Sequence, residues 1–194
     1  MTKPAFIIAG THSGVGKTTV TLAVMAGFKN AGFRVQGYKV GPDFIDPSYH
    51  ELLTGFPSHN LDDWMMGPSK VVKLFKETFQ NADVAVVEGV MGLFDGFGTK
   101  SDEGSTAAIA KLLNIPGILV IDGSHMARSV AAVVKGYESL DPQIKIAGVI
   151  LNRVASSHHF NLLRESIEHY TSCPVWGGLV RDETLKIPQR HRNQ

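Results

Sequence analysis

The sequence has little of what marks secreted, membrane or nucleic-acid-binding proteins. Cys173 is the only cysteine in 194 residues, which excludes an internal disulfide framework. No apolar run approaches the roughly 20 residues that cross a bilayer, and the apolar segment 5–9 is too short for a signal peptide. The formal net charge of +1 provides no field that attracts nucleic acid or acidic membranes. These absences predict a cytoplasmic protein with neither nucleic-acid nor membrane partners.

What is present is the composition of an ordinary globular domain. Hydrophobic residues make up 43% and charged residues 19% of the chain, which is typical of soluble domains. A length of 194 residues is enough for one substantial core. The sequence contains no internal repeat, low-complexity segment or flexible linker. We therefore expect residues 1–194 to form a single domain.

Apolar segments alternate with helical patterns along the chain. The pattern predicts strands at 5–10, 33–40, 84–88, 117–122, 144–151 and 174–180, and helices at 17–31, 68–80, 105–113, 126–140 and 157–171. The interval 41–66 is expected to be irregular, because it holds Pro42, Pro47, Gly55 and Pro57. Continuous apolar strands separated by helices indicate an α/β fold, a parallel sheet with helices on both faces. Ligands of such sheets bind beyond the carboxyl ends of the strands.

The segment Gly10–Thr19, with the sequence GTHSGVGKTT, directly follows the first predicted strand and is typical of a phosphate-binding loop (P-loop). Its glycines allow backbone N–H groups to face a polyphosphate, its lysine would meet the β- and γ-phosphates, and its first threonine could ligate Mg²⁺. The usual pattern has a glycine five positions before Gly16, where this chain has Thr11; Gly10 lies one residue earlier. The pattern predicts nucleotide binding by Gly14, Val15, Gly16, Lys17, Thr18 and Thr19.

Two further polar segments follow predicted strands. The segment Lys39–Pro47 places a lysine, Asp43 and Asp46 on a Gly/Pro-rich loop, a combination that suits phosphate and Mg²⁺. The segment Glu88–Gly96 begins with a carboxylate at a strand tip, where it could ligate Mg²⁺ or orient water. For both segments the alternative is structural: a solvated turn, or a strand-end carboxylate with its own partners.

Three other residues have both a functional and a structural interpretation. Ser105 begins a predicted helix, where it could help to hold a substrate carboxylate or simply cap the helix. Asn152 ends a predicted strand, where its amide could read an adenine edge or cap a helix. Cys173 precedes Pro174 and an apolar segment, and we interpret it as structural.

Taken together, these segments resemble the ATP-binding domain of the cobyrinate a,c-diamide synthase family. The most specific matches are Gly-Pro-Asp-aromatic-Ile-Asp-Pro at 41–47 and Glu-Gly-Val-Met-Gly-Leu-Phe-Asp-Gly at 88–96. The resemblance continues through the P-loop and through residues 105–112, 128–129, 148–154 and 185–191. It implies a P-loop NTPase-type fold similar to that of dethiobiotin synthetase.

The resemblance also implies an activity: ATP- and Mg²⁺-dependent amidation of the a and c acetate carboxylates of cobyrinate, through acyl phosphates, in cobalamin biosynthesis. It implies catalytic roles for Lys17, Lys39, Asp46 and Asp95, metal binding by Thr18, Asp43 and Glu88, a substrate contact at Ser105 and an adenine contact at Asn152. Ammonia would come from a C-terminal glutaminase domain that follows the segment 185–191 in the family. We therefore expect this chain to be an N-terminal fragment without that domain, and a homodimer is a further option.

Other interpretations stay open at this point. The same chemistry could act on hydrogenobyrinate or nickel sirohydrochlorin. A partitioning-type nucleotide-switch ATPase, which dimerises on ATP, shares the general fold and a P-loop. Such proteins usually carry an additional lysine early in the loop, where this chain has Thr11. Dethiobiotin synthetase itself is disfavoured, because residues 88–96 fit it poorly.

Overall fold

The computed structural model describes residues 3–182, and they form seven strands and seven helices. The predicted family segment at 185–191 lies outside the described residues. The strands are β1 (Ala5–Gly10), β2 (Val35–Val40), β3 (His59–Leu61), β4 (Val84–Glu88), β5 (Gly117–Asp122), β6 (Ile146–Val154) and β7 (Val175–Val180). The helices are α1 (Lys17–Asn30), α2 (Asp46–Thr54), α3 (Asp63–Met66), α4 (Pro68–Phe79), α5 (Thr106–Leu113), α6 (Ser129–Leu140) and α7 (Ser157–Tyr170).

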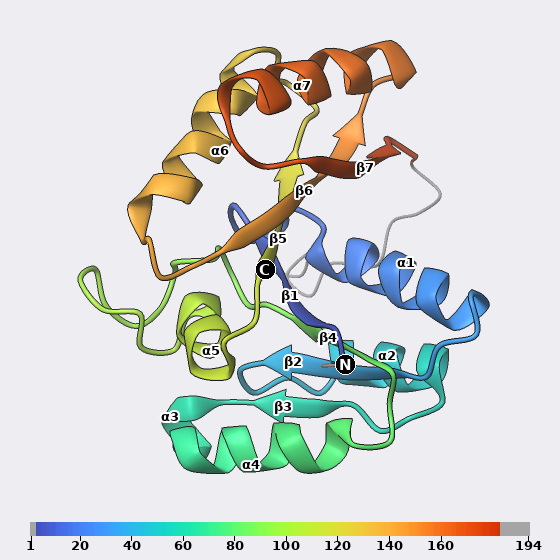
Figure 1. Cartoon of the computed structure of the whole chain (residues 1–194), viewed down its shortest axis with the longest axis vertical. Coiled ribbons are helices and arrows are strands. Elements are labelled where there is room, and N and C mark those ends of the chain that lie inside the picture. The colour runs from blue at the N-terminus through green and yellow to red at the C-terminus, as the bar shows by residue number, and fades with distance from the viewer. Residues whose placement is uncertain (1–2, 183–194) are drawn as a thin grey trace, which may run out of the picture.

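All seven strands belong to one sheet in the order β3-β2-β4-β1-β5-β6-β7, and every pairing is parallel (Figure 1). The chain leaves β1 toward β2 on one side and later returns to build β5, β6 and β7 on the other. Strand β1 therefore lies at the point where the direction of winding reverses. In open α/β sheets, ligands bind at the carboxyl ends of the strands beside this point.

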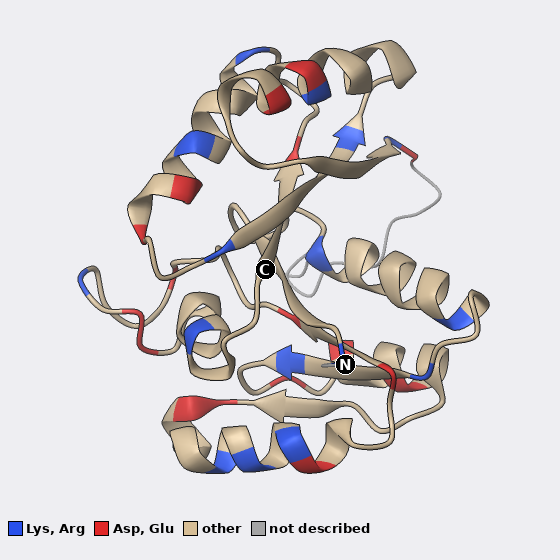
Figure 2. Ribbon diagram, in the orientation of Figure 1, with Lys and Arg blue, Asp and Glu red and all other residues tan. Residues whose placement is uncertain are grey.

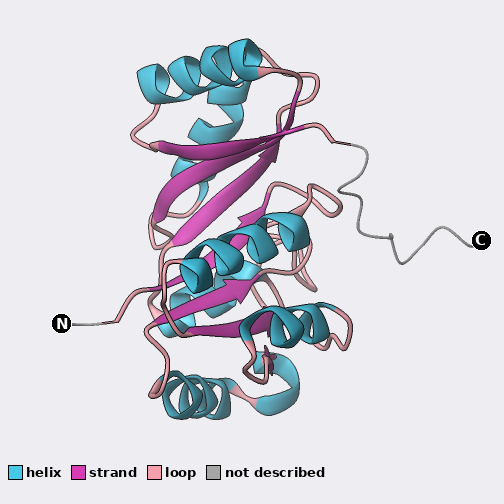
Figure 3. Cartoon of the chain, turned by 90° about the vertical axis from the view of Figure 1, so that its right-hand side faces the viewer, coloured by secondary structure: helices cyan, strands magenta, loops and turns pink. Residues whose placement is uncertain are grey.

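Helices cover both faces of the sheet (Figure 3). On one face, α1 and α2 pack against residues of β1, β2, β4 and β5, with Val20 and Met25 of α1 fully buried. On the other face, α4 and α5 cover one end of the sheet, and α6 and α7 cover β5 and β6. Because both faces are covered, the strands can be apolar on both sides, as the continuous apolar runs predicted. The predicted parallel sheet with helices on both faces is confirmed.

The prediction of an irregular interval at 41–66 is wrong, because this interval contains α2, β3 and α3. Pro47 lies in the first turn of α2. Backbone N–H groups in a first turn have no acceptor within the helix, so the N–H that proline lacks costs no hydrogen bond there. Gly55 forms the C-cap of the same helix. Asp62 caps α3 by accepting hydrogen bonds from the N–H groups of Trp64 and Met65. The residues interpreted as breakers are therefore the boundaries of short elements.

Positive and negative residues are interspersed along α4 and α6 (Figure 2), in line with the small net charge of the chain. Within residues 3–182, no helix combines the length and apolarity that crossing a membrane requires.

Candidate functional site

The P-loop connects β1 to α1 at the centre of the sheet. Gly16 immediately precedes α1 with φ 99°, in the left-handed region that favours glycine. A Cβ atom at this position would lie 2.1 Å from Nδ2 of Asn152, so no larger residue fits. Val15 is fully buried and anchors the loop in the core. The loop therefore has its essential glycine where the geometry requires it, despite the shifted Gly10.

Two residues at the end of β6 hold the loop in place. Asn152 donates a hydrogen bond from Nδ2 to the carbonyl of Val15, at 2.8 Å. Arg153 donates from Nη2 to the carbonyl of Gly14, at 2.9 Å, and from Nη1 to Oδ2 of Asp122 on β5, at 2.6 Å. The structure thus places Asn152 beside the P-loop, as a nucleotide contact requires, with its amide supporting the loop backbone. Contact with adenine stays a prediction.

Lys17, the first residue of α1, is a largely buried cation at the base of the loop. Its ammonium group donates hydrogen bonds to the carbonyls of Met91 and His12. Burial, assisted by the positive charge of Lys39, lowers the pKa of Lys17 to about 8. A poorly solvated ammonium group among neutral carbonyls is a strong site for an anion such as phosphate.

Glu88, at the end of β4, is fully buried and has three side-chain partners. Its Oε1 accepts hydrogen bonds from Thr18 Oγ1 at 2.6 Å and from Lys39 Nζ at 2.9 Å. Its Oε2 lies 2.8 Å from Nε2 of His50. Burial alone would raise the pKa of Glu88, but the hydrogen bond from His50 and the charge of Lys39 outweigh it and lower the pKa to about 2. Glu88 is therefore an ionised carboxylate at neutral pH.

Lys39 links Glu88 to Asp46. It lies on β2 directly beside Glu88 in the sheet register, and its Nζ is 2.7 Å from Oδ2 of Asp46, the first residue of α2. Burial tends to lower the pKa of Lys39, but the two carboxylates outweigh that effect and raise it. Four predicted site residues, namely Thr18, Lys39, Asp46 and Glu88, thus meet in one buried charge cluster beside the P-loop.

Asp43 and Asp95 lie on the loops that flank this charge cluster. Asp43 accepts hydrogen bonds from the N–H groups of Ile45 and Asp46, at 2.8 and 3.2 Å, and so shapes the entry to α2. Asp95 accepts from the N–H of Gly92 at 2.9 Å, and its negative charge acts on Lys17. Both carboxylates are therefore positioned by backbone groups at the same edge of the sheet.

Ser105 has the structural role that was one of its two interpretations. It is fully buried, and its hydroxyl caps α5 by accepting a hydrogen bond from the N–H of Ala108 at 3.1 Å. Contact with a substrate carboxylate stays a prediction. Cys173 is buried, as expected of a structural cysteine.

His50 is the site residue that the sequence reasoning missed. It is fully buried, with one ring nitrogen facing Glu88 and the other 3.1 Å from the hydroxyl of Ser58. A signal was present: Pro47 and Gly55 fit the start and end of a helix. In such a helix, His50 lies one turn beyond Asp46 on the same side.

The donors around Thr18 suit Mg²⁺. A hydroxyl and an ionised carboxylate are hard oxygen ligands, which Mg²⁺ prefers. Residues 3–182 contain no group of three or more His, Cys, Asp or Glu that could hold a metal ion. This is compatible with Mg²⁺ in nucleotide sites, where waters and phosphates supply most of the ligands.

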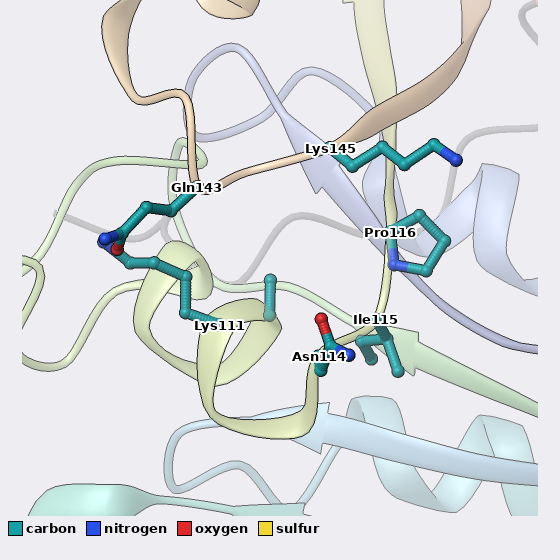
Figure 4. Close-up of a pocket in the computed structure, with 7 residues that line it drawn as sticks. Lys111, Asn114, Ile115, Pro116, Gln143 and Lys145 are labelled. Atoms are coloured by element: carbon teal, nitrogen blue, oxygen red, sulfur yellow. The ribbon is translucent and has the colours of Figure 1, made fainter.

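A cavity of about 300 Å³, lined in part by Lys111, Asn114, Pro116 and Lys145, lies elsewhere (Figure 4). Pro116 directly precedes β5, so this cavity is at the amino ends of the strands. The P-loop is at their carboxyl ends, and the cavity is not part of the site.

A P-loop after the central strand of a parallel sheet, joined to buried lysine and carboxylate side chains, defines a P-loop nucleotide-binding domain. Comparison with known families agrees: residues 6–194 match the model described as "CobQ/CobB/MinD/ParA nucleotide binding domain". The chain belongs to this family.

Individual proteins within and beyond this family are also similar to the chain. The chain is 50% identical over 95% of its length to a protein of Listeria innocua serovar 6a named cobyrinate a,c-diamide synthase. It is 49% identical over 98% of its length to a protein of the same name from Dehalococcoides mccartyi. It spans 41% of the length of each relative. Among solved structures, chloroplast FtsY from Physcomitrella patens has the same fold, with a TM-score of 0.63 at 19% identity, over 94% of this chain and 60% of that one.

Proposed function

We propose that this domain uses ATP to activate the a and c acetate carboxylates of cobyrinate for amide formation. The observation that carries the proposal is the meeting of Thr18 of the P-loop and Lys39 on one oxygen of Glu88. A second buried lysine beside the P-loop provides positive charge for a phosphoryl group in transfer, beyond what nucleotide binding requires. The two relatives that share nearly the whole chain carry the name of this activity.

In the first step, a carboxylate oxygen of the tetrapyrrole attacks the γ-phosphorus of ATP. The bond between that phosphorus and the β–γ bridging oxygen breaks, ADP leaves, and an acyl phosphate results. Negative charge is spread over the transferred oxygens, so catalysis depends on positioning and on positive charge. Lys17 would exchange its carbonyl partners for phosphate oxygens, and Lys39 would add a second positive charge beside the P-loop.

In the second step, the nitrogen of ammonia attacks the acyl carbon. The bond from that carbon to the phosphate oxygen breaks, phosphate leaves with the bonding electrons, and the nitrogen loses a proton to form the neutral amide. Asp46 and Asp95 would order the substrate loop or steer the ammonia, and a carboxylate of this kind would accept the proton. In the complete protein, a glutaminase domain would supply the ammonia.

Thr18, Glu88 and Asp43 are the residues that would hold Mg²⁺. When bound, Mg²⁺ would neutralise charge on the β- and γ-phosphates. Asn152 would contact the adenine, and Ser105 would contact a substrate carboxylate.

The test is ATP consumption with Mg²⁺ and ammonium chloride, in the presence and absence of cobyrinic acid, with mass spectrometry of the tetrapyrrole. We expect ADP release to require the acceptor and to match the number of hydroxyl-to-amine exchanges. Lys17→Ala should remove about 2–4 kcal/mol of transition-state stabilisation. Hydrogenobyrinate and nickel sirohydrochlorin serve as alternative acceptors. ATP binding without turnover on any of the three acceptors would contradict the proposal.

A nucleotide-switch ATPase is the second candidate, because the family description also names MinD and ParA. This function predicts ATP-driven dimerisation with no acceptor present. Sedimentation with and without ATP distinguishes it from the ligase, whose ATP use depends on the acceptor.

A further inference from the structure

Several large apolar side chains are exposed on the segments that follow β2, β3 and β4. Phe44 is 88% exposed, Trp64 66%, Met65 65% and Phe97 68%. Leaving apolar side chains of this size in water forgoes the stabilisation that their burial would provide. Exposed apolar side chains that lie against one another mark binding surfaces in soluble proteins, and Trp64 and Phe97 are in contact.

Trp64 and Phe97, which we term the aromatic pair, are held in a fixed arrangement. Their ring centroids are 5.8 Å apart with an interplanar angle of 67°, an edge-to-face contact. The ring of Phe97 lies against Gly104, where φ is 74° and a Cβ atom would be 2.5 Å from the ring. Only glycine permits this approach. Two exposed rings fixed in this way lose little conformational entropy when a ligand covers them.

The aromatic pair borders the charge cluster. Trp64 belongs to α3, which begins just after β3, and Asn60 of β3 donates from Nδ2 to the carbonyl of Asp43 at 2.8 Å. Phe97 follows Asp95 by two residues, and the charge of Asp95 acts on Lys17. Figure 1 shows α3 at the edge of the molecule toward which β2 and β3 point. A ligand on the pair is therefore beside the phosphoryl-transfer site.

We propose that Trp64 and Phe97 receive the conjugated ring system of the tetrapyrrole while one of its peripheral carboxylates reaches Lys39 and the P-loop. This inference rests on the proposed function. A tetrapyrrole carries its carboxylates on side chains around a broad, largely apolar ring. When one carboxylate is at the γ-phosphate, the ring must lie on the neighbouring surface. Aromatic side chains bind the faces of such conjugated rings.

The chain itself provides a reporter for this contact, because it has two tryptophans. Trp176 lies on β7 with its ring against Gly148 of β6, away from the aromatic pair. Trp176→Phe leaves Trp64 as the only indole, and Trp64→Phe leaves only Trp176. We expect cobyrinic acid to quench the fluorescence of the Trp176→Phe protein with saturation. The Trp64→Phe protein should lose most of the saturable quenching. Equal saturable quenching in both variants would overturn the inference.

Kinetics provide a readout that merely structural damage would not give. Trp64→Ala and Phe97→Ala should each raise the KM for cobyrinic acid about tenfold and leave the Kd for ATP unchanged. Leu140→Ala is the matched control, since Leu140 is also 68% exposed but ends α6. Wild-type turnover with an unchanged KM in both variants would show that the aromatic pair does not bind the tetrapyrrole, and the proposed function would be unaffected. A wild-type protein that neither binds nor amidates any tetrapyrrole would overturn both.

Sedimentation of the same variants tests whether a second copy of the chain, instead of the tetrapyrrole, covers the aromatic pair. If wild-type protein dimerises and Trp64→Ala abolishes the dimer while the KM for cobyrinic acid stays unchanged, a second copy covers the aromatic pair and the inference is wrong. A monomeric wild type with the raised KM in the variants supports the tetrapyrrole.

Discussion

The contact between His50 and Glu88 leads to a prediction about stability. Nε2 of His50 is 2.8 Å from Oε2 of Glu88, and both side chains are fully buried. Thr18 and Lys39 contact the other carboxylate oxygen, so His50→Ala removes the donor that Oε2 has in this structure. Glu88 keeps Lys39 as a charged partner, so the loss is that of one hydrogen bond to a buried charged group, which is worth about 1.5–3 kcal/mol. We expect the free energy of unfolding to fall by that amount, out of the roughly 5–15 kcal/mol typical of a domain.

Urea unfolding followed by far-UV circular dichroism measures this change. His50→Gln keeps an N–H donor at a similar distance from the backbone, and we expect it to cost about 1 kcal/mol. His158→Ala is the control, because His158 is exposed at the start of α7, and its effect should stay within about 0.5 kcal/mol. If His50→Ala cost no more than the exposed control, or if alanine and glutamine were equally harmful, His50 would not stabilise the Glu88 carboxylate.

The same contact predicts a pH dependence. The pKa of Glu88 falls from 4.5 in the unfolded chain to about 2 in the folded protein. The unfolded chain therefore binds more protons between these values, and the stability gained from Glu88 is lost as the pH falls through this window. The difference in unfolding free energy between wild type and His50→Ala should narrow over the same interval.

Three further predictions concern the loop and the core. Because burial lowers the pKa of Lys17 to about 8, ATP binding at about pH 8.5 should take up protons. Calorimetry in buffers of different ionisation enthalpy measures this uptake, which Lys17→Arg should remove. Asn152→Ala releases the carbonyl of Val15 and should weaken ATP binding by about 1–2 kcal/mol in a titration; unchanged affinity would exclude a role in nucleotide binding. Cys173→Ala should leave acceptor-dependent turnover unchanged, since the thiol is buried; lost turnover with an intact fold would give it a catalytic role.

Local patterns were enough to predict the central part of the site. The P-loop and the strand end at Glu88 are contiguous segments whose chemistry is visible in a few neighbouring residues. Their meeting follows from parallel topology, because carboxyl ends of neighbouring strands share one edge. Lys39 and Glu88 are opposite each other in the register of β2 and β4, which the positions of both residues at strand ends already favoured.

Other parts of the site depend on contacts that no local pattern contains. Asn152 is in van der Waals reach of Gly16 although 136 positions separate them, so its support of the P-loop could not be read from the sequence. The role of His50 depends on α2, whose boundaries at Pro47 and Gly55 look in the sequence like breakers of an irregular segment. The aromatic pair joins α3 to the loop after β4, and residues in α3 were expected to be irregular.

Activation of a tetrapyrrole carboxylate as an acyl phosphate leaves a trace in the oxygen atoms of the released phosphate. The most direct test uses cobyrinic acid whose carboxylates carry heavy oxygen, together with ATP, Mg²⁺ and ammonium, and follows the label by mass spectrometry of the released phosphate. We expect each amide formed to transfer one heavy oxygen from the carboxylate to phosphate. Amide formation with no label in the phosphate would contradict this activation.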